Sequence, residues 1–513
     1  MFARVQAELD PAKPAVIHAA SGSVVSFGQL ESRANQLAQL LRSAGVQQRD
    51  HIALFMQNSI DMIAWEAAAE RAGLYYTLVN THLSGNEVAH IIDDCRAEVV
   101  VVSRALLALA AEAMPACPAV TRWFITGTEA VDEPFEAYEP TLADYPFIPI
   151  DDELLGGPML YSSGTTGRPK GIFRSLPDVA PGQAIPRYDL VRKLLDMREG
   201  MVYLSPAPLY HGAAQSSVAT SLRLGATTVV MDRFDAEAFL GLVERYRVTH
   251  TQVVPTMFSR LLDLPQDVRE RFDVSSLECV VHAAAPCPVA IKEQMIDWLG
   301  PILREFYSAS EANGATACNT HEWRTHPGTV GRPIFGELLI MDDDGTVCGP
   351  GEIGTVWFRG ATNFEYFNDP EMTAASRDAT GTMSTVGDIG YHDADGYLYL
   401  TDRKSMMIIS GGVNVYPQEI EDLLISHPMV FDAAVIGVPN RDLGEEVRGV
   451  VQVAAGAAAG PELEAELIAW CRARLAHFKC PRAIDFAESL PRTPTGKMAK
   501  RLLRDTYWAD VAS

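Results

Sequence analysis

Apolar residues in the first half of the chain follow two different periods. The three- and four-residue spacing of a helix with one buried face appears at Leu30, Ala34, Leu37 and Leu41. Short apolar runs, many of them β-branched, alternate with helical stretches at 52–55, 99–102, 228–231, 252–254 and 279–281. Continuous apolar runs of this length are typical of parallel strands that are covered on both faces. From about residue 25 the pattern therefore predicts an α/β fold with largely parallel, doubly covered sheets.

The pattern changes after about residue 335, where Gly, Asp and Pro become frequent. Asp-Asp-Gly at 343–345 and Asp-Gly at 395–396 are typical hairpin turns, so short antiparallel strands are expected here. A second compact unit begins at about residue 403. It opens with the segment 406–409 and a Gly-Gly turn, and its expected elements are a helix at 417–427, a strand at 433–438 and a helix at 461–475. We expect a large N-terminal domain over residues 1–402 and a small α+β domain over residues 403–513.

Composition and charge narrow the range of functions. The chain has 513 residues, 48% of them hydrophobic, and a formal net charge of −24. Such an acidic chain repels a phosphate backbone, so no nucleic acid partner is expected. No apolar run approaches the roughly 18 residues of a spanning helix, so neither a transmembrane segment nor a signal peptide is expected. The eight cysteines form no CxxC pair, which is typical of reduced thiols in a cytoplasmic protein.

The segment most indicative of chemistry is 161–171, which reads Tyr-Ser-Ser-Gly-Thr-Thr-Gly-Arg-Pro-Lys-Gly. Glycine lets backbone N–H groups approach a phosphate without a Cβ in the way, and the hydroxyls and Lys170 add donors and charge. The segment is not a Walker A loop, because the Gly-Lys-Ser/Thr ending is missing. On these residues alone, a phosphate-binding loop and an ordinary surface loop both stay open.

The segment SSGTTGRPKG resembles the signature of the adenylate-forming superfamily, which includes acyl-CoA synthetases, peptide-synthetase adenylation domains and luciferases. Further segments resemble other landmarks of the superfamily, in the same order along nearly the whole chain. They are PLYH at 208–211, AAAP at 283–286, YSASE at 307–311, GD at 387–388, DR at 402–403, SGGVNVYPQEIE at 410–421 and PRTPTGK at 491–497. The resemblance implies doubly covered sheets plus a β-barrel-like part in the large domain, and a mobile C-terminal domain. It also implies an acid–CoA ligase that uses ATP, Mg²⁺ and coenzyme A.

The resemblance gives individual residues a role. Lys497 is expected to be the catalytic lysine, and Glu311 to hold Mg²⁺, which prefers one or two carboxylates plus phosphate oxygens. Asp388 would bind the ribose hydroxyls, Arg403 would lie near the ribose and phosphates, and Tyr307 would stack on adenine. Without the resemblance, each of the five would be interpreted as a capping, turn, surface or core residue. The other expected ATP or AMP contacts are Ser162, Ser163, Gly164, Thr165, Thr166, Gly167, Lys170 and Ser310.

The resemblance also implies sites for the acyl group and for the thiol. The expected acyl pocket is formed by His211, Gly212, Ala214, Ala283 and Ala284. His211 is in addition a candidate catalytic residue. The small side chains leave room for a fatty, aromatic or polycyclic acid and do not favour acetate. The coenzyme A channel is expected at Gly411 and Gly412, and the hinge of the C-terminal domain at Ser405.

Five positions depart from the pattern of the superfamily, and none of them removes a residue expected to carry the chemistry. Ser310 and Ser308 replace a Thr and a Gly of the YGxTE segment. Ala283 replaces the first Gly of GAAP, Val413 replaces the Glu of SGGEN, and Ser405 replaces the usual Asp or Lys of the hinge.

Other functions stay open at this stage. A peptide-synthetase adenylation domain needs an anionic residue for the substrate amino group, and 210–214 contains none. A luciferase-like oxygenase shares the fold, and a related ligase could load a separate carrier protein. A non-enzymatic acyl- or nucleotide-binding module would be expected to have lost Lys497, Glu311 or Asp388. We therefore predict an ATP-dependent acid–CoA ligase that acts on a small-molecule carboxylic acid in the cytoplasm, and a homodimer stays open.

Overall fold

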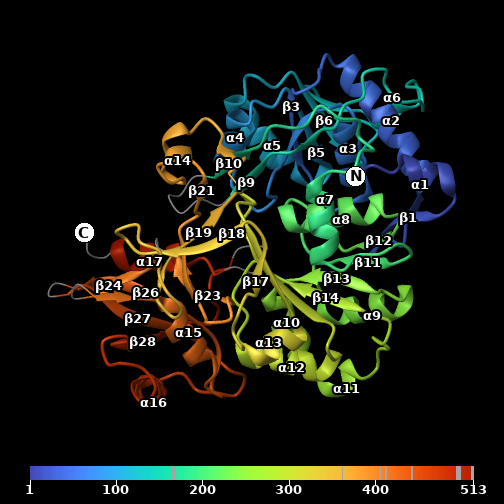
Figure 1. Ribbon diagram of the computed structural model, residues 1–513. Coiled ribbons are helices and arrows are strands. Elements are labelled where there is room, and N and C mark those ends of the chain that lie inside the picture. The colour runs from blue at the N-terminus through green and yellow to red at the C-terminus, as the bar shows by residue number, and fades with distance from the viewer. Residues whose placement is uncertain are drawn as a thin grey trace.

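The computed structural model (Figure 1) describes residues 1–162, 169–360, 362–403, 406–410, 413–440, 443–492 and 498–509. Within these ranges, the side chains at 402, 403, 414 and 509 are not described. Two large sheets form the N-terminal part, as the alternating pattern predicts, and three smaller sheets complete the fold. In these ranges no helix is both long and apolar enough to cross a membrane.

The first large sheet has six strands in the order β7-β6-β5-β3-β4-β8, and all its pairs are parallel. Along β3, Ile52 and Leu54 belong to one core and Ala53 and Phe55 to another, so both faces are covered. The strands expected at 52–55 and 99–102 are confirmed. The bounds are β3 (His51–Phe55), β4 (Tyr75–Leu78), β5 (Val99–Ser103), β6 (Arg122–Thr126), β7 (Phe135–Ala137) and β8 (Gly157–Pro158).

The second large sheet has nine strands in the order β17-β16-β15-β14-β13-β11-β12-β1-β2. Its strands from β15 to β1 run parallel, and the two edges add antiparallel pairs. The three apolar runs expected as later strands are confirmed as β12, β13 and β14. The bounds are β1 (Pro14–His18), β2 (Val24–Ser26), β11 (Val202–Ser205), β12 (Thr227–Val230), β13 (His250–Val253), β14 (Cys279–His282), β15 (Leu303–Ser308), β16 (Ala315–Asn319) and β17 (Arg332–Phe335).

Helices cover both faces of both sheets. Three helices share one core with residues of both sheets, such as Leu54 and Val281, and therefore lie between them: α2 (Phe27–Ser43), α3 (Ile60–Arg71) and α8 (Gly212–Arg223). Two pack on the other face of the first sheet, α4 (Gly85–Asp94) and α5 (Leu107–Ala113). Three pack on the other face of the second, α9 (Ala236–Tyr246), α10 (Pro255–Leu262) and α12 (Val289–Leu299). The shorter elements are α1 (Arg4–Leu9), α6 (Glu139–Leu142), α7 (Pro186–Leu194), α11 (Gln266–Arg269), α13 (Thr320–Thr325), α14 (Pro370–Ala375) and 3₁₀ turns at Arg104–Leu106 and Met114–Ala116.

The part expected to be barrel-like consists of two antiparallel sheets. A hairpin joins β22 and β23, and Gly396 in its turn has φ +81°, which confirms the turn expected at 395–396. One sheet contains β18 (Glu337–Met341), β19 (Gly354–Arg359), β21 (Met383–Ser384), β22 (Asp388–His392) and β23 (Leu398–Arg403). The other contains β9 (Leu160–Ser162), β10 (Lys170–Phe173) and β20 (Glu365–Tyr366).

The strands after residue 407 form a sheet of their own, which lies beside the β18–β23 sheet in Figure 1, with α15 next to β23. The helix expected at 417–427 ends at Ile425, because Pro428 disfavours helical backbone at the residue before it. The bounds are β24 (Ile408–Ser410), β25 (Val413–Val415), α15 (Pro417–Ile425), β26 (Val430–Asn440), β27 (Gly444–Val453), α16 (Pro461–Arg472), β28 (Ala483–Phe486) and α17 (Lys500–Ala509).

Candidate active site

The glycine-rich signature connects two strands that pair with each other. Ser162 at the end of β9 lies opposite Lys170 at the start of β10, so the ends of the segment between them are held together. The side chain of Lys170 lies next to α14 and β20, with Nζ 2.7 Å from Met372 Sδ and 5.9 Å from the ring centroid of Tyr366. The expected phosphate contacts Ser163, Gly164, Thr165, Thr166 and Gly167 lie outside the described residues.

Glu311 and Lys170 both lie next to Tyr366, and these three residues together with Arg174 form one cluster. The hydroxyl of Tyr366 donates a hydrogen bond to Glu311 Oε1 over 2.9 Å, and Glu311 is only 8% exposed. The carbonyl of the preceding residue, Ser310, accepts a hydrogen bond from Arg174 over 2.5 Å. The antiparallel pair β9–β10 therefore places Lys170 and Arg174 near the carboxylate of Glu311.

A magnesium ion fits this arrangement if ATP supplies most of its ligands. The described residues contain no group of three His, Cys, Asp or Glu side chains that could hold a metal ion. Mg²⁺ usually binds one or two carboxylates, retains water and takes further oxygens from a nucleotide. The single buried carboxylate of Glu311 meets that requirement, whereas zinc would need three or four side chains.

Asp388 and Tyr307 meet where β22 begins and β15 ends. The hydroxyl of Tyr307 donates a hydrogen bond to Asp388 Oδ2 over 2.6 Å, and Asp388 is 5% exposed. Asp388 also pairs in register with Arg403 of β23, whose side chain is not described. Three residues that the sequence assigns to the nucleoside are thus brought together from separate strands.

Tyr307→Phe tests this grouping. We expect the KM for ATP to rise at least about tenfold with kcat changed much less, because the lost hydrogen bond to a charged group is worth about 1.5–3 kcal/mol and holds the carboxylate that is expected to bind the ribose. Initial rates of pyrophosphate release over a range of ATP concentrations measure both constants.

The matched control for Tyr307→Phe is Tyr399→Phe. Tyr399 lies in β23, in the same sheet as Asp388, and its hydroxyl donates to Asp393 Oδ2 over 3.2 Å, away from the expected ribose position. Its KM for ATP should stay at the parental value. A Tyr307→Phe enzyme with an unchanged KM for ATP would remove Tyr307 from the nucleotide site.

His211 occupies the N-cap position of α8, in extended backbone, and its ring centroid lies 4.4 Å from that of Tyr210. Ala214 is buried in the first turn of the same helix. Ala283 is buried beyond the end of β14, and Ala284 is exposed with φ +74°, a conformation uncommon for a residue with a Cβ. The expected acyl residues thus come from two separate chain segments, the start of α8 and the turn after β14.

Gly212 does not leave the space expected of it. A Cβ at this position would lie 2.5 Å from Leu160 Cδ1, so the side chain of Leu160 already occupies that volume. The absence of a side chain at Gly212 allows α8 to pack closely against β9. Room for an acyl group therefore has to come from the alanines and not from Gly212.

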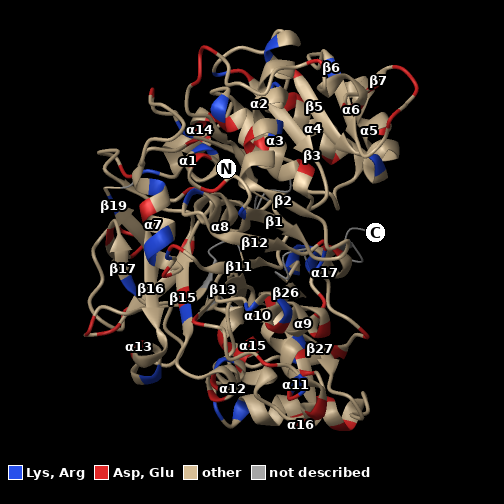
Figure 2. Cartoon of the chain, turned by 90° about the vertical axis from the view of Figure 1, so that its right-hand side faces the viewer, with Lys and Arg blue, Asp and Glu red and all other residues tan. Residues whose placement is uncertain are grey.

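Four further expected residues, Ser405, Gly411, Gly412 and Lys497, lie outside the described residues. The chain on both sides of the 493–497 segment is well anchored. Arg492 forms an ion pair with Asp432 over 2.6 Å and a β-bridge with Met498, and Lys500 pairs with Glu421 over 2.8 Å. Figure 2 shows basic positions on α17, the helix that begins at Lys500, among the mixed charges of the surrounding elements.

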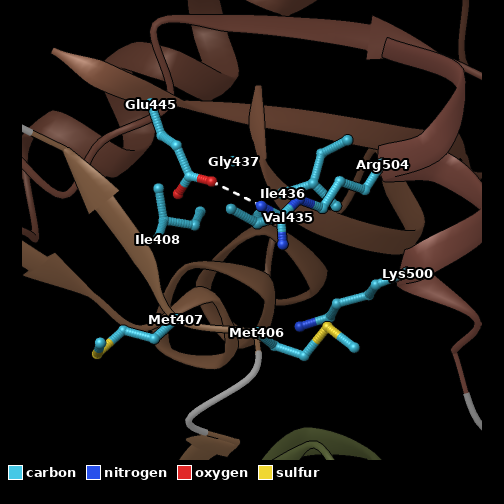
Figure 3. A pocket seen from close by; sticks show the side chains of 9 residues that line it. All are labelled: Met406, Met407, Ile408, Val435, Ile436, Gly437, Glu445, Lys500 and Arg504. Carbon is cyan, nitrogen blue, oxygen red and sulfur yellow. Dashed lines mark hydrogen bonds and ion pairs between the residues drawn. The ribbon is translucent and has the colours of Figure 1, made fainter. Parts of the chain in front are cut away.

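A small pocket lies beside this anchored segment (Figure 3). It is lined by residues of 406–408, β26 and α17, together with Glu445, whose carboxylate forms an ion pair with Arg504 over 2.9 Å. Its volume of about 10 Å³ is close to the minimum for a single water molecule. It therefore does not accommodate an acyl chain or a nucleotide.

The sequence did not reveal two residues of the cluster, Tyr366 and Arg174. Tyr366 follows no recognisable motif, and its partner Glu311 is 55 positions away. Arg174 could have been noticed, because a charged residue directly follows the apolar Ile172-Phe173 end of a strand. Both contacts depend on how β10 and β20 pair, which the local sequence does not specify.

Two family models match the chain. The model described as AMP-binding enzyme matches residues 3–367, and the model described as AMP-binding enzyme C-terminal domain matches residues 419–497. The first match contains the segments at 162–171, 208–211, 283–286 and 307–311, and the second contains the segment at 491–497, whereas 387–388, 402–403 and most of 410–421 lie between the two matches.

Curated relatives match over nearly the whole length. The chain is 31% identical to the long-chain-fatty-acid–CoA ligase FadD13 of Mycobacterium tuberculosis, over 99% of this chain and 98% of the relative. It is 32% identical to the 2-succinylbenzoate–CoA ligase of Bacillus licheniformis, over 97% of this chain and 98% of the relative. The crystal structure of ATP-bound MatB from Rhodopseudomonas palustris is similar with a TM-score of 0.83 and 28% identity, over 100% of both chains. These matches confirm the resemblance seen in the sequence, and the chain belongs to the family of AMP-binding enzymes.

Proposed function

We propose that this protein is an ATP-dependent acid–CoA ligase. In the first step the carboxylate attacks the α-phosphate of ATP and forms an acyl-adenylate, with release of pyrophosphate. In the second step the thiol of coenzyme A displaces AMP. The observation that carries the proposal is the hydrogen bond between Tyr307 and Asp388. It brings together two residues expected at the nucleoside, and the buried carboxylate of Glu311 follows Tyr307 closely in the chain. A module that only bound an apolar acid would have no need of these groups.

The proposed roles follow the chemistry of each step. Lys497 stabilises the negative charge that builds up as the carboxylate attacks the α-phosphate. Glu311 would hold Mg²⁺, which would neutralise charge on the phosphate oxygens, and the 162–170 segment would bind the pyrophosphate side. Asp388 and Arg403 bind the ribose side of the nucleotide, and Tyr307 offers its aromatic face to adenine.

We further propose that the chain divides into domains at residues 1–402 and 403–513. Rotation about Ser405 would remove Lys497 after the first step and bring Gly411 and Gly412 to the thiol channel. The separate sheet formed after residue 407 supports this division, since each part has its own strand pairing and its own apolar core.

The acid proposed is apolar and of medium or larger size, in the fatty, aromatic or polycyclic range. Support comes from Ala214, Ala283 and Ala284 at the expected acyl site, and from relatives named for a long-chain fatty acid and for 2-succinylbenzoate. Each additional buried methylene contributes about 0.8 kcal/mol. We expect kcat/KM for CoA-thioester formation to increase from acetate to octanoate and aromatic acids.

A panel of acids assayed for pyrophosphate and for CoA-thioester tests the proposal. Pyrophosphate release that depends on an added acid separates an enzyme from a binding module. Thioester formation with free coenzyme A separates a CoA ligase from a ligase that loads a carrier protein. A kcat/KM that is highest for acetate would contradict the acid class and leave the reaction class intact.

Cytoplasmic location and a homodimeric state stay proposals. All eight cysteines lie in the described part of the chain and are free thiols, six of them buried, which agrees with a reducing compartment.

A further inference from the structure

Two arginines form no ion pair with any residue in the described ranges: Arg187, beside the helix that carries part of the expected acyl site, and Arg174, beside the expected magnesium carboxylate. Arg174 follows β10 and donates to the carbonyl oxygen of Ser310. Arg187, the second residue of α7, donates to Gln215 Oε1 over 3.1 Å and to Ser216 Oγ over 2.8 Å. These acceptors are neutral, so the described residues leave both positive charges without a neighbouring carboxylate in contact. Partly buried charges of this kind are stabilised when an anion binds.

The two guanidinium groups are close enough to influence each other. Burial, and then the charge of Arg187, lower the pKa of Arg174 to about 10, while the carboxylate of Glu311 acts in the opposite direction. Both arginines therefore belong to one positively charged region, which adjoins the magnesium carboxylate on the side of Arg174.

A neutral network holds Arg187 in place. Gln215 on α8 is almost fully buried, and its Nε2 donates to Glu66 Oε2 over 3.0 Å and to the Tyr76 hydroxyl over 2.9 Å. Burial raises the pKa of Glu66 to about 8, so this carboxyl group is mostly protonated at neutral pH. Gln215 thus fixes Arg187 and bridges it to the Glu66 carboxyl group, so the guanidinium, which stays protonated in proteins, forms no ion pair there.

The position of this network on α8 points to the acyl group. The backbone N–H of Gln215 bonds to the carbonyl oxygen of His211, so Gln215 lies one helical turn beyond His211 on the same face. The resemblance places the acyl group against His211 and Ala214. Gln215, which holds Arg187, therefore lies about one turn, roughly 5 Å, farther along α8 than His211.

We propose that Arg187, held by Gln215 and Ser216 and assisted by Arg174, binds an anionic group at the distal end of the acyl substrate. The preferred acid would then be a dicarboxylic acid, with an apolar body between a reactive carboxylate and a second carboxylate. A guanidinium binds a carboxylate through two parallel hydrogen bonds, which gives both affinity and direction. This inference rests on the proposed ligase function and specifies its substrate class.

Matched pairs of acids test the inference: octanoate with octanedioate, decanoate with decanedioate, and cinnamate with 4-carboxycinnamate. In the parent enzyme we expect kcat/KM for pyrophosphate release to be at least tenfold higher for the diacid in the best pair. Arg187→Met should abolish this preference by lowering kcat/KM for the diacid, with the value for the monoacid unchanged or raised and the KM for ATP unchanged. Arg187→Lys should retain part of the preference, and Arg174→Met should reduce it less.

Arg192→Met is the matched control, because Arg192 is an exposed arginine on the same helix. It should keep the full preference. The inference would be overturned if Arg187→Met lowered kcat/KM equally for the diacid and the monoacid of each pair. It would also be overturned if the parent enzyme preferred the monoacid in every pair. A raised KM for ATP together with an unchanged diacid preference would also overturn it, by assigning Arg187 to nucleotide phosphate.

The melting temperature of the parent and of Arg187→Met, measured with each acid, is a readout that does not require turnover. If the diacid raised the melting temperature of the parent more than the monoacid did, and Arg187→Met showed no such difference, the subsite would be supported. If at the same time no acid released pyrophosphate, only the proposed ligase function would be rejected. If no acid pair differed in melting temperature or in turnover, the subsite would be rejected. Turnover of monoacids in that case would leave the ligase function standing.

Discussion

Lys497→Ala should lower the rate of acyl-adenylate formation by at least about 100-fold, while conversion of supplied acyl-AMP and coenzyme A to the thioester should proceed near the parental rate. The lysine is proposed to stabilise charge that develops only in the first step, and removal of one such group commonly costs a factor of 10² to 10³. Pyrophosphate release and thioester formation, measured on one preparation, give the two rates separately.

Lys479→Ala is the control for this result. Lys479 also lies in the C-terminal part and forms an ion pair with Glu419 over 2.6 Å, with no role assigned in the chemistry. It should change neither half-reaction by more than a small factor. If Lys497→Ala lowered both half-reactions equally, its effect would lie in folding or domain movement and not in adenylate formation.

The parts of the fold that the sequence predicts are those in which a local pattern has one structural outcome. The run 99–102 is apolar at every position, and a strand buried on both faces is the arrangement that accommodates it. Asp-Gly at 395–396 needs a backbone that glycine adopts easily, and the structure has that hairpin. The end of α15 was less predictable from the sequence. Pro428 disfavours helical backbone at residue 427, but this rule does not specify that the helix ends two residues earlier, at Ile425.

The candidate site was predictable as a set of residues but not as a set of contacts. Tyr307 and Asp388 could be selected from their motifs, yet nothing in those motifs states that their side chains form a hydrogen bond across 81 positions. Gly212 was expected to leave space, and the structure fills that space with Leu160 from a different strand. Such contacts depend on strand register and helix packing, and these are set by the whole core.

The pair formed by Lys292 and Glu305 is another feature that the sequence conceals. Lys292 lies on α12, Glu305 on β15, and their Nζ and Oε2 atoms are 2.5 Å apart with side-chain exposures of 1% and 7%. His282 Nε2 lies 3.5 Å from the same carboxylate, and burial keeps the pKa of this histidine well below its usual value. Burial also raises the pKa of Glu305, against the effect of the lysine charge. Removal of the lysine would therefore leave a buried carboxylate with no cation in contact.

Lys292→Met should destabilise the N-terminal part by about 3–5 kcal/mol, the usual effect of breaking a buried ion pair at one partner. For the proposed domain of about 400 residues this corresponds to a fall in melting temperature of about 4–6 °C. The double variant Lys292→Met, Glu305→Leu should recover much of the loss, since it removes both charges and keeps apolar volume. Differential scanning calorimetry of the parent and the two variants measures these shifts.

The pH dependence of this effect has a definite sign. In Lys292→Met the carboxyl group of Glu305 keeps a pKa above its unfolded value, so the folded state binds the proton more tightly and stability falls as pH rises. The loss relative to the parent should be larger at pH 8 than at pH 6, and the double variant should not show this trend.

Arg324→Met provides the control for the size of the effect. Arg324 pairs with Asp297, which lies on α12 like Lys292, over 3.3 Å at the surface, with side-chain exposures of 58% and 77%. Exposed pairs contribute at most about 1 kcal/mol, so its melting temperature should change by only about 1 °C or less. Equal shifts for Lys292→Met and Arg324→Met would show that burial of the Lys292–Glu305 pair has no special energetic consequence.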